Sequence, residues 1–236
     1  MTESPTALIT GASSGIGLAC AEKLLQQGYQ VIGISRTSPE SIANHENFQS
    51  ISLDLSRSGG FDQVWAEQLK EKQIDCFIHS AGQGIFGSIE QFSNAQIESS
   101  IRLNLTSAIL ICRHVIPRMR QQKQGQVVLL GSESALTAGQ KGALYSAAKF
   151  GLRGFSQALR ADCASDGIRV SLVNPGMVRS PFFDTLNFAP GGADENAINV
   201  GDVATSIWQI LSSSSNVVID EVNLSPRIKS IDFNKK

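Results

Sequence analysis

The stretch LITGASSGIGLACAEKLL, residues 8–25, runs from an apolar strand through a glycine-rich turn into a helix. The turn contains Gly11, Gly15 and Gly17, together with the hydroxyl donors Ser13 and Ser14. Glycines let the backbone approach a phosphate, and the helix start offers free N–H groups and a positive dipole end. The turn follows the first strand, so a phosphate site is expected there. Because the spacing is G-x-x-x-G-x-G rather than G-x-G-x-x-G, a tight connection that binds nothing is the alternative.

Short apolar runs alternate with longer helical segments along the rest of the chain. The expected strands cover residues 7–10, 30–35, 49–53, 75–79, 126–131, 169–173 and 217–222. The expected helices cover residues 15–27, 61–72, 95–121, 145–165 and 202–211. This alternation predicts an α/β fold, a Rossmann-like doubly wound parallel sheet of about seven strands with helices on both faces.

No linker or repeat divides the chain, so we expect residues 1–236 to form a single domain. Residues 178–199 differ from the rest because they contain several phenylalanines, Pro190 and two glycines without a clean period. This composition predicts a flap over a substrate site, and an irregular surface loop is the alternative.

Composition narrows the function classes. The 236 residues are 42% hydrophobic and carry 20 basic and 21 acidic side chains, without a basic patch, so nucleic acid is not an expected partner. No apolar run approaches the ~20 residues that span a bilayer, and no secretion signal precedes residue 5, so a cytoplasmic location away from membranes is expected. The cysteines do not cluster with histidines, which predicts reduced thiols and no metal site. They are Cys20, Cys76, Cys112 and Cys163.

Arg36 stands where dinucleotide folds usually place an acidic residue that binds the ribose 2′-hydroxyl of NAD. The segment GISRT, residues 33–37, has no Asp or Glu, and none occurs from Tyr29 through Pro39. A guanidinium group suits a 2′-phosphate. The sequence therefore favours NADP(H) over NAD as the cofactor, and a solvated loop arginine is the alternative.

The order of these motifs resembles the short-chain dehydrogenase/reductase family, in its single-domain branch, over nearly the whole chain. TGASSGIG, residues 10–17, is similar to the cofactor turn of that family, and SLDLS, residues 52–56, to its adenine-contacting segment. NPGMV, residues 174–178, with Ser180 resembles the strand end that holds the nicotinamide. The resemblance implies further cofactor contacts from Ile16, Asp54, Leu55, Ala81, Gly82, Pro175, Gly176, Val178 and Ser180.

HSAG, residues 79–82, departs from the Asn-Asn-Ala-Gly of the family in its first two positions. Ala81 and Gly82, which let the backbone approach the cofactor, are kept. We interpret His79 as a packed residue at a strand end rather than as a catalytic base.

Tyr145 and Lys149 lie four positions apart in LYSAAKFGL, residues 144–152. On a helix this spacing places both side chains on one face. At a distance of ~6 Å and an effective dielectric of ~20, the ammonium stabilises a tyrosinate by about 3 kcal/mol. That energy predicts a pKa lowered by roughly 2 units, which suits Tyr145 for general acid/base work near neutrality. An ordinary amphipathic pair is the alternative interpretation.

The resemblance adds the remaining catalytic roles. It implies that Ser132 orients the substrate oxygen, that Asn104 holds a water for a proton relay, and that Tyr145 and Lys149 form the catalytic pair and contact the cofactor, Lys149 through the nicotinamide ribose. The expected function is an NADP(H)-dependent reductase or dehydrogenase acting on a small-molecule carbonyl or alcohol, as a homodimer or homotetramer.

Three alternatives stay open at this point. One is an enoyl reductase of the same family, although those enzymes typically have a longer Tyr-to-Lys spacing. Another is an NADP(H)-sensing regulator without turnover, although such proteins usually lose the tyrosine or the lysine. The third is a structural or adaptor protein on the same scaffold, which buried polar groups would make costly.

Overall fold

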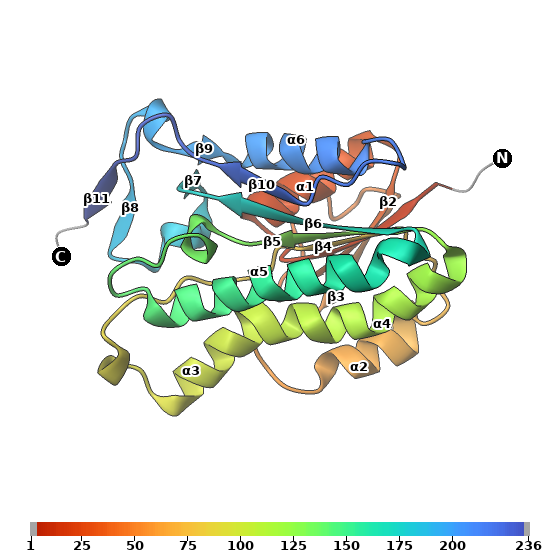
Figure 1. Ribbon diagram of the computed structural model, residues 1–236, viewed down its shortest axis with the longest axis horizontal. Helices are drawn as coiled ribbons and strands as arrows, with labels where there is room; N and C mark the ends of the chain where they lie inside the picture. The colour runs from red at the N-terminus through yellow and green to blue at the C-terminus, as the bar shows by residue number, and fades with distance from the viewer. Residues whose placement is uncertain (1–3, 234–236) are drawn as a thin grey trace.

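Seven parallel strands form the central sheet of the computed structural model, which describes residues 4–233 (Figure 1). Their order across the sheet is β10-β6-β5-β4-β1-β2-β3, which confirms the expected doubly wound fold. The order reverses beside β1, and ligands of such sheets bind at this switch point, outside the carboxyl ends of the strands. The strands are β1 (Thr6–Thr10), β2 (Gln30–Ser35), β3 (Phe48–Ser52), β4 (Cys76–His79), β5 (Gly125–Leu130), β6 (Ile168–Pro175) and β10 (Glu221–Leu224).

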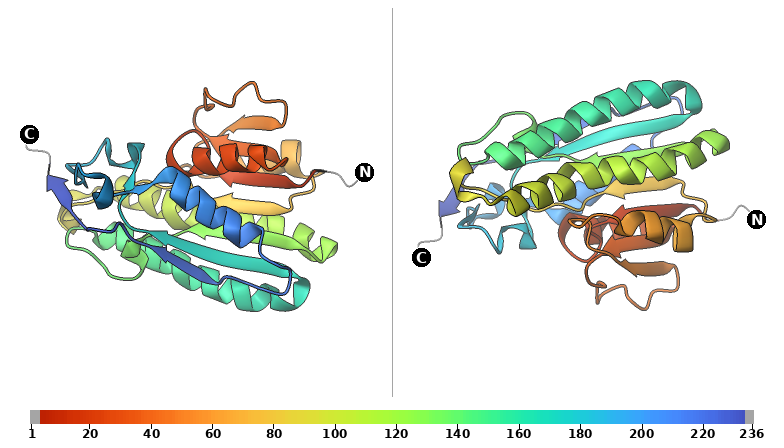
Figure 2. Two further views of the ribbon diagram at one scale, coloured as in Figure 1. Left: turned by 90° about the horizontal axis from the view of Figure 1, so that it is seen from above. Right: turned by 90° about the horizontal axis from the view of Figure 1, so that it is seen from below.

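Helices cover both faces of the sheet (Figures 1 and 2). Helices α1 (Gly15–Gln26) and α6 (Val200–Leu211) pack against each other on one face, and α2 (Gly60–Val64), α4 (Ser107–Gln122) and α5 (Ala143–Cys163) lie on the other. The strands are apolar on both sides because each face is covered. Ala7, Leu8 and Ile9 of β1, for example, are all fully buried.

The long helix expected over residues 95–121 is interrupted. It consists of α3 (Asn94–Ile101), one turn of π-helix η3 (Arg102–Thr106) and α4. Helix α3 begins at Ser93, whose side chain accepts a hydrogen bond from the Gln96 amide in a capping box. The region expected as a helix over residues 61–72 is likewise α2 followed by a π-helical turn, η1 (Trp65–Leu69).

The last strand of the sheet begins later than the sequence suggested. We expected residues 217–222, whereas β10 begins at Glu221 and pairs with β6 from Leu172 onward. The Arg169 guanidinium donates to the carbonyl oxygens of Ser213 and Val217, at 3.0 and 3.3 Å. These bonds hold the preceding segment as a loop, because they use carbonyl groups that a strand would direct toward its neighbour.

Short elements organise the segment 178–199, which the sequence presented as irregular. Strands β7 (Val178–Arg179) and β9 (Ile198–Asn199) pair in parallel. Strand β8 (Phe188–Pro190) pairs antiparallel with β11 (Ile231–Phe233), so the end of the described chain is tied to this segment. Among residues 4–233, no helix is long and apolar enough to cross a membrane, and no cluster of side chains suits a metal ion.

Candidate active site

The glycine turn and the loop after β4 meet at the switch point. Gly11 has a φ of +69°, and a Cβ there would lie 2.9 Å from the Ala81 nitrogen. A Cβ on Gly17 would overlap the Gly11 carbonyl oxygen. The first position needs a residue that tolerates a left-handed backbone, and the second needs one without a side chain, so glycine suits both.

The start of α1 is open to an anion. Its N-cap residue Ser14 is exposed and makes no capping hydrogen bond through its side chain, and the first turn contains no acidic residue. Gly15 has a φ of +57°, and Ser13 and Ile16 flank the same turn. The helix N-terminus and its N–H groups therefore fit the diphosphate of a nicotinamide dinucleotide.

Arg36, Asp54 and Leu55 follow the next two strands at the same edge. Arg36 is exposed, and its carbonyl oxygen accepts a hydrogen bond from the Ser52 hydroxyl at 3.2 Å. Asp54 accepts from the Ser56 hydroxyl at 2.6 Å, a bond that lowers the pKa of the carboxyl, and the charge of Arg36 contributes to the lowering. Leu55 is buried below them.

The segment after β6 returns to the glycine turn. Gly176 donates its N–H to the Leu224 carbonyl oxygen at 2.8 Å, which continues the pairing beyond Pro175. Val178 is buried, and a Cβ on Gly15 would lie 3.6 Å from the Cβ of Ser180. The structure thus brings this segment to the glycine turn.

Tyr145 and Ser132 come together from α5 and from the turn after β5. Tyr145 is only 6% exposed, and its side chain lies near that of Ser132. Burial raises the pKa of Tyr145 to about 12, and the nearby Ser132 hydroxyl opposes this rise only in part. The expected lowering of the Tyr145 pKa is therefore wrong, since removal from water outweighs the stabilising contacts.

The position of the Lys149 ammonium explains why it does not lower the pKa of Tyr145. Its Nζ lies 5.7 Å from the centroid of the Tyr145 ring and donates to the Leu130 carbonyl oxygen at 2.8 Å. The ammonium is thus bound to β5 and held over the ring. Burial lowers the pKa of Lys149 to about 8.

Asn104 lies in the π-helical turn η3, where it binds the backbone that follows β4. Its Oδ1 accepts from the Gln83 N–H at 3.1 Å, and its Nδ2 donates to the carbonyl oxygens of Gln83 and Ser100, each at 3.0 Å. A Cβ on Gly82 would lie 2.9 Å from Asn104 Oδ1 and 3.7 Å from Lys149 Nζ. Asn104, Gly82 and Lys149 are therefore neighbours.

His79 is fully buried, as expected for a packed strand-end residue. Burial lowers the pKa of its imidazole to about 3, and the nearby charge of Lys149 acts in the same direction. The ring is therefore neutral at physiological pH.

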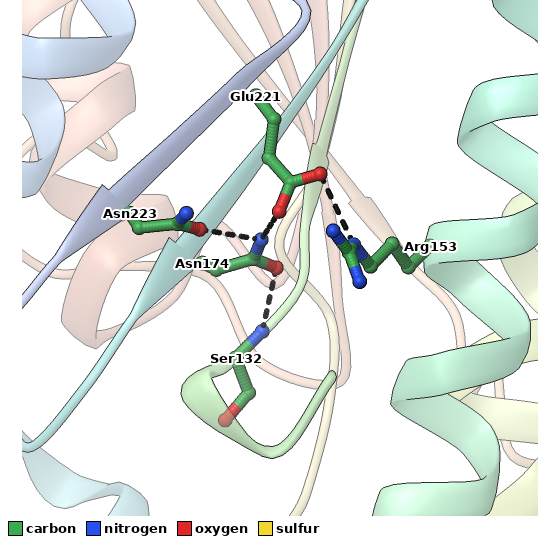
Figure 3. Close-up of polar contacts among 5 residues, drawn as sticks. All are labelled: Ser132, Arg153, Asn174, Glu221 and Asn223. Atoms are coloured by element: carbon green, nitrogen blue, oxygen red, sulfur yellow. Dashed lines mark hydrogen bonds and ion pairs between the residues drawn. The ribbon is translucent and has the colours of Figure 1, made fainter. Parts of the chain in front are cut away.

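A polar network behind Ser132 was missed in the sequence (Figure 3). Asn174 accepts the Ser132 N–H at 3.2 Å and donates to Glu221 at 2.8 Å and to Asn223 at 2.9 Å. Glu221 also pairs with Arg153 of α5 at 3.1 Å. The NPG motif at residues 174–176 was the available signal, but nothing local indicates its partners in β10. In Figure 3 the Ser132 hydroxyl points away from this network. Its oxygen accepts the Ser134 N–H at 3.1 Å, and its proton can still be donated into the site.

A family model described as short chain dehydrogenase matches residues 5–190. The chain belongs to this family. It is 34% identical over 187 residues, 77% of each chain, to the 3-oxoacyl-[acyl-carrier-protein] reductase FabG of Buchnera aphidicola. It is also 27% identical to an uncharacterized oxidoreductase of Staphylococcus epidermidis, over 93% of this chain and 96% of that relative.

Solved structures of short-chain dehydrogenases share the fold. An alcohol dehydrogenase from the archaeon Thermococcus sibiricus, complexed with 5-hydroxy-NADP, superposes with a TM-score of 0.85 over 97% of this chain and 99% of its own, at 21% identity. A serine dehydrogenase complexed with NADP+ gives a TM-score of 0.80 over 93% and 94%, also at 21% identity. At these identities the likeness establishes the fold, and the chain is an oxidoreductase by its family.

Proposed function

We propose that this short-chain dehydrogenase is an NADP(H)-dependent oxidoreductase that interconverts a carbonyl compound and its alcohol, with Tyr145 as general acid/base. The observation that carries the proposal is the burial of Tyr145 and Lys149 together, with the Lys149 ammonium 5.7 Å from the Tyr145 ring centroid and the Ser132 side chain nearby. Buried polar groups that converge in this way need partners or a task.

The chain supplies the proton chemistry of the reaction. With its pKa raised to about 12, Tyr145 is protonated at neutral pH and can give its proton to a carbonyl oxygen. Ser132 donates a hydrogen bond to the same oxygen as negative charge develops. The hydride that reduces the carbonyl carbon comes from the reduced nicotinamide when this cofactor is bound.

The proton that Tyr145 loses must be replaced. Lys149 Nζ and Asn104 Oδ1 both lie beside Gly82, at the positions a Cβ there would meet. We assign the return of a proton from solvent to this pair. The lowered pKa of Lys149, about 8, suits proton exchange near neutrality.

Arg36 supports NADP(H) as the cofactor. It is exposed at the carboxyl end of β2 and lies close enough to Asp54 for its charge to lower the pKa of that carboxyl. Guanidinium groups bind phosphates in a bidentate manner, so Arg36 would hold the 2′-phosphate. Two structural relatives named above carry NADP-type ligands, although a 4-hydroxyisoleucine dehydrogenase with the same fold was solved with NADH.

The remaining assignments belong to the same proposal. The protein acts as a single domain over residues 1–236, with residues 178–199 as the substrate flap. It works in the cytoplasm, which suits its four buried, unpaired cysteines. It assembles as a homodimer or homotetramer, because α4 and α5 expose Ile109 and Phe150 by 38% and 43%.

The test is NADPH oxidation by the purified protein with a panel of aldehydes, ketones and keto acids. Turnover should be lost in Tyr145→Phe and should fall at least ~100-fold in Ser132→Ala, since removing one oxyanion donor costs that much. Tight NADPH binding without turnover on every panel member would instead favour a non-catalytic NADP(H) sensor.

Cofactor choice is tested by Arg36→Ala. Loss of a charged hydrogen bond to the 2′-phosphate should raise the KM for NADPH about 10- to 100-fold and leave that for NADH unchanged. The matched control is Arg113→Ala, an exposed arginine on α4 that pairs loosely with Asp62 at 3.9 Å. Equal effects on both cofactors would contradict the role of Arg36.

A further inference from the structure

Tyr145 belongs to a cluster of packed aromatic rings. Its ring centroid lies 5.3 Å from that of Phe86 and 6.0 Å from that of Phe182. Phe86 in turn packs edge-on against Phe188, at 5.0 Å. We call Phe86, Phe182 and Phe188 the aromatic wall. Two further rings extend it, Phe183 against Phe182 and Phe188, and Phe233 against Phe188.

The wall is assembled from separate segments. Phe86 follows β4, Phe182 lies in the short 3₁₀ turn Pro181–Phe183, and Phe188 begins β8. Strand β11 lies beside β8 at the left of Figure 1 and carries Phe233. A Cβ on Gly84 would lie 2.7 Å from the Phe182 ring and 2.9 Å from the Phe86 ring, so glycine makes room for both rings.

Two cationic side chains of these segments are engaged elsewhere. Arg179 donates to the carbonyl oxygens of Gly191 and Ala193, at 3.3 and 3.1 Å. Lys229 pairs with Glu133 at 2.8 Å. Lys141 lies near Phe86, because its carbonyl oxygen accepts the Gly87 N–H, but its side chain is exposed. The buried cation beside Tyr145 is Lys149, which donates to the Leu130 carbonyl oxygen. The Glu133 carboxylate lies close enough to Tyr145 for its charge to raise the pKa of that hydroxyl, so an anionic group beside Tyr145 would also be near a like charge.

We propose that the substrate of this protein is an uncharged aromatic carbonyl compound, an inference that rests on the carbonyl chemistry proposed above. A substrate carbonyl at Tyr145 would bring its substituent near the rings of Phe86 and Phe182, which pack on the Tyr145 ring. An aromatic substituent can make edge and stacking contacts with these rings, whereas a small aliphatic group makes fewer and a carboxylate makes none. The wall thus selects for a ring next to the reacting carbonyl and against charge.

Three α-keto substrates separate these features, with NADPH as the reductant. Ethyl benzoylformate is aromatic and neutral, ethyl pyruvate is neutral but lacks the ring, and benzoylformate has the ring but carries a carboxylate. We expect kcat/KM for ethyl benzoylformate to exceed the values for ethyl pyruvate and for benzoylformate about tenfold or more. Burying part of one aromatic ring supplies a free energy that corresponds to this factor. Equal values, or a preference for benzoylformate, would overturn the proposal.

Variants of the wall locate the preference. Phe182→Ala should reduce the advantage of ethyl benzoylformate over ethyl pyruvate at least about threefold, and Phe182→Leu should retain part of it. The control is Val217→Ala, which shortens an exposed apolar side chain in the loop before β10. Thermal melting of each variant identifies any loss of folding. An unchanged substrate ratio in a folded Phe182→Ala protein would show that the wall does not select the ring.

A binding measurement separates this inference from the proposed function. Calorimetry on Tyr145→Phe loaded with NADP+ should give acetophenone a lower Kd than both acetone and benzoate. If the wild-type protein turns over none of the substrates but Tyr145→Phe binds acetophenone more tightly than acetone and benzoate, the proposed function fails and the ligand class stands. If acetone or benzoate binds as tightly as acetophenone, the ligand class fails whatever the turnover.

Discussion

The imidazole Nδ1 of His79 lies 3.0 Å from the hydroxyl oxygen of Thr10. The same hydroxyl oxygen accepts the N–H groups of Ser80 and Ala81, each at 3.1 Å. The Thr10 hydroxyl proton therefore points to Nδ1, which acts as the acceptor. This bond joins the end of β1, where the glycine turn begins, to the end of β4.

The opposite ring nitrogen faces the interrupted helix. Because the His79 ring is neutral and Nδ1 is an acceptor, its proton lies on Nε2, which is 3.4 Å from the Ser107 hydroxyl oxygen. Ser107 donates to the Leu103 carbonyl oxygen at 2.8 Å, next to Asn104. One chain of hydrogen bonds thus connects the cofactor turn with the π-helical turn η3.

This chain predicts an energetic coupling between Thr10 and His79. In urea unfolding, His79→Phe should put a somewhat larger apolar ring in this position and lower the free energy of unfolding by about 2 kcal/mol, because the Thr10 hydroxyl loses a buried acceptor. In the double variant with Thr10→Val, the loss of unfolding free energy should be about 1 kcal/mol smaller than the sum of the losses in the two single variants. The longer contact with Ser107 provides the comparison, and its cycle with Ser107→Ala should give a weaker coupling. Additive losses in the Thr10 cycle would exclude the bond.

The same histidine should make stability depend on pH. Its folded pKa of about 3 lies below the ordinary value of 6.5, so the unfolded chain takes up a proton first as the pH falls. The stability that the neutral His79 ring contributes is therefore fully present above pH 6.5 and is lost as the pH falls from 6.5 to 3. Between pH 7 and pH 5 this amounts to about 2 kcal/mol. Urea midpoints over this range should fall in the wild type and fall less in His79→Phe; parallel slopes would assign the loss to other groups.

Asn174 should show a charge conflict when it is changed to aspartate. Asn174→Asp would place a second carboxylate 2.8 Å from Glu221, in a position that is only 1% exposed. We expect a loss of about 2–4 kcal/mol in the free energy of unfolding, and a lower kcat because repulsion from Glu221 shifts the side-chain oxygen that accepts the Ser132 N–H. Adding Glu221→Gln removes the like charge, so stability should largely return. A double variant as unstable as Asn174→Asp alone would contradict this account.

Lys149 should trade stability for activity. Burial lowers its pKa from 10.5 to about 8, so the folded protein carries a charge that burial disfavours. Below pH 8 this cost is present in full, and it declines as the pH rises toward 10.5. Lys149→Met should therefore stabilise the protein by about 1–3 kcal/mol at pH 7, less about 1 kcal/mol for the lost bond to Leu130, while NADPH turnover is abolished. A melting temperature below that of the wild type would show that the ammonium stabilises the fold.

Much of the fold could be predicted because it depends on local patterns. Strand–helix alternation, the glycines after β1 and the spacing from Tyr145 to Lys149 all express geometry within a few residues, and β2 and α1 lie almost where expected. The carboxyl ends of parallel strands meet at one edge, so motifs that follow separate strands could be assigned to one site. The sequence by itself thus determined the family, the sheet and the position of the candidate site.

The tertiary structure decided the properties that depend on distant segments. The pKa of Tyr145 rises because packing against distant segments, the rings of Phe86 and Phe182 among them, removes it from water, and no local spacing encodes that desolvation. Asn174 finds Glu221 in the neighbouring strand 47 positions away. Helical periodicity placed Lys149 beside Tyr145, but its bond to Leu130 holds its charge over the ring. Burial and electrostatic partners are set by packing between elements, which only the folded chain defines.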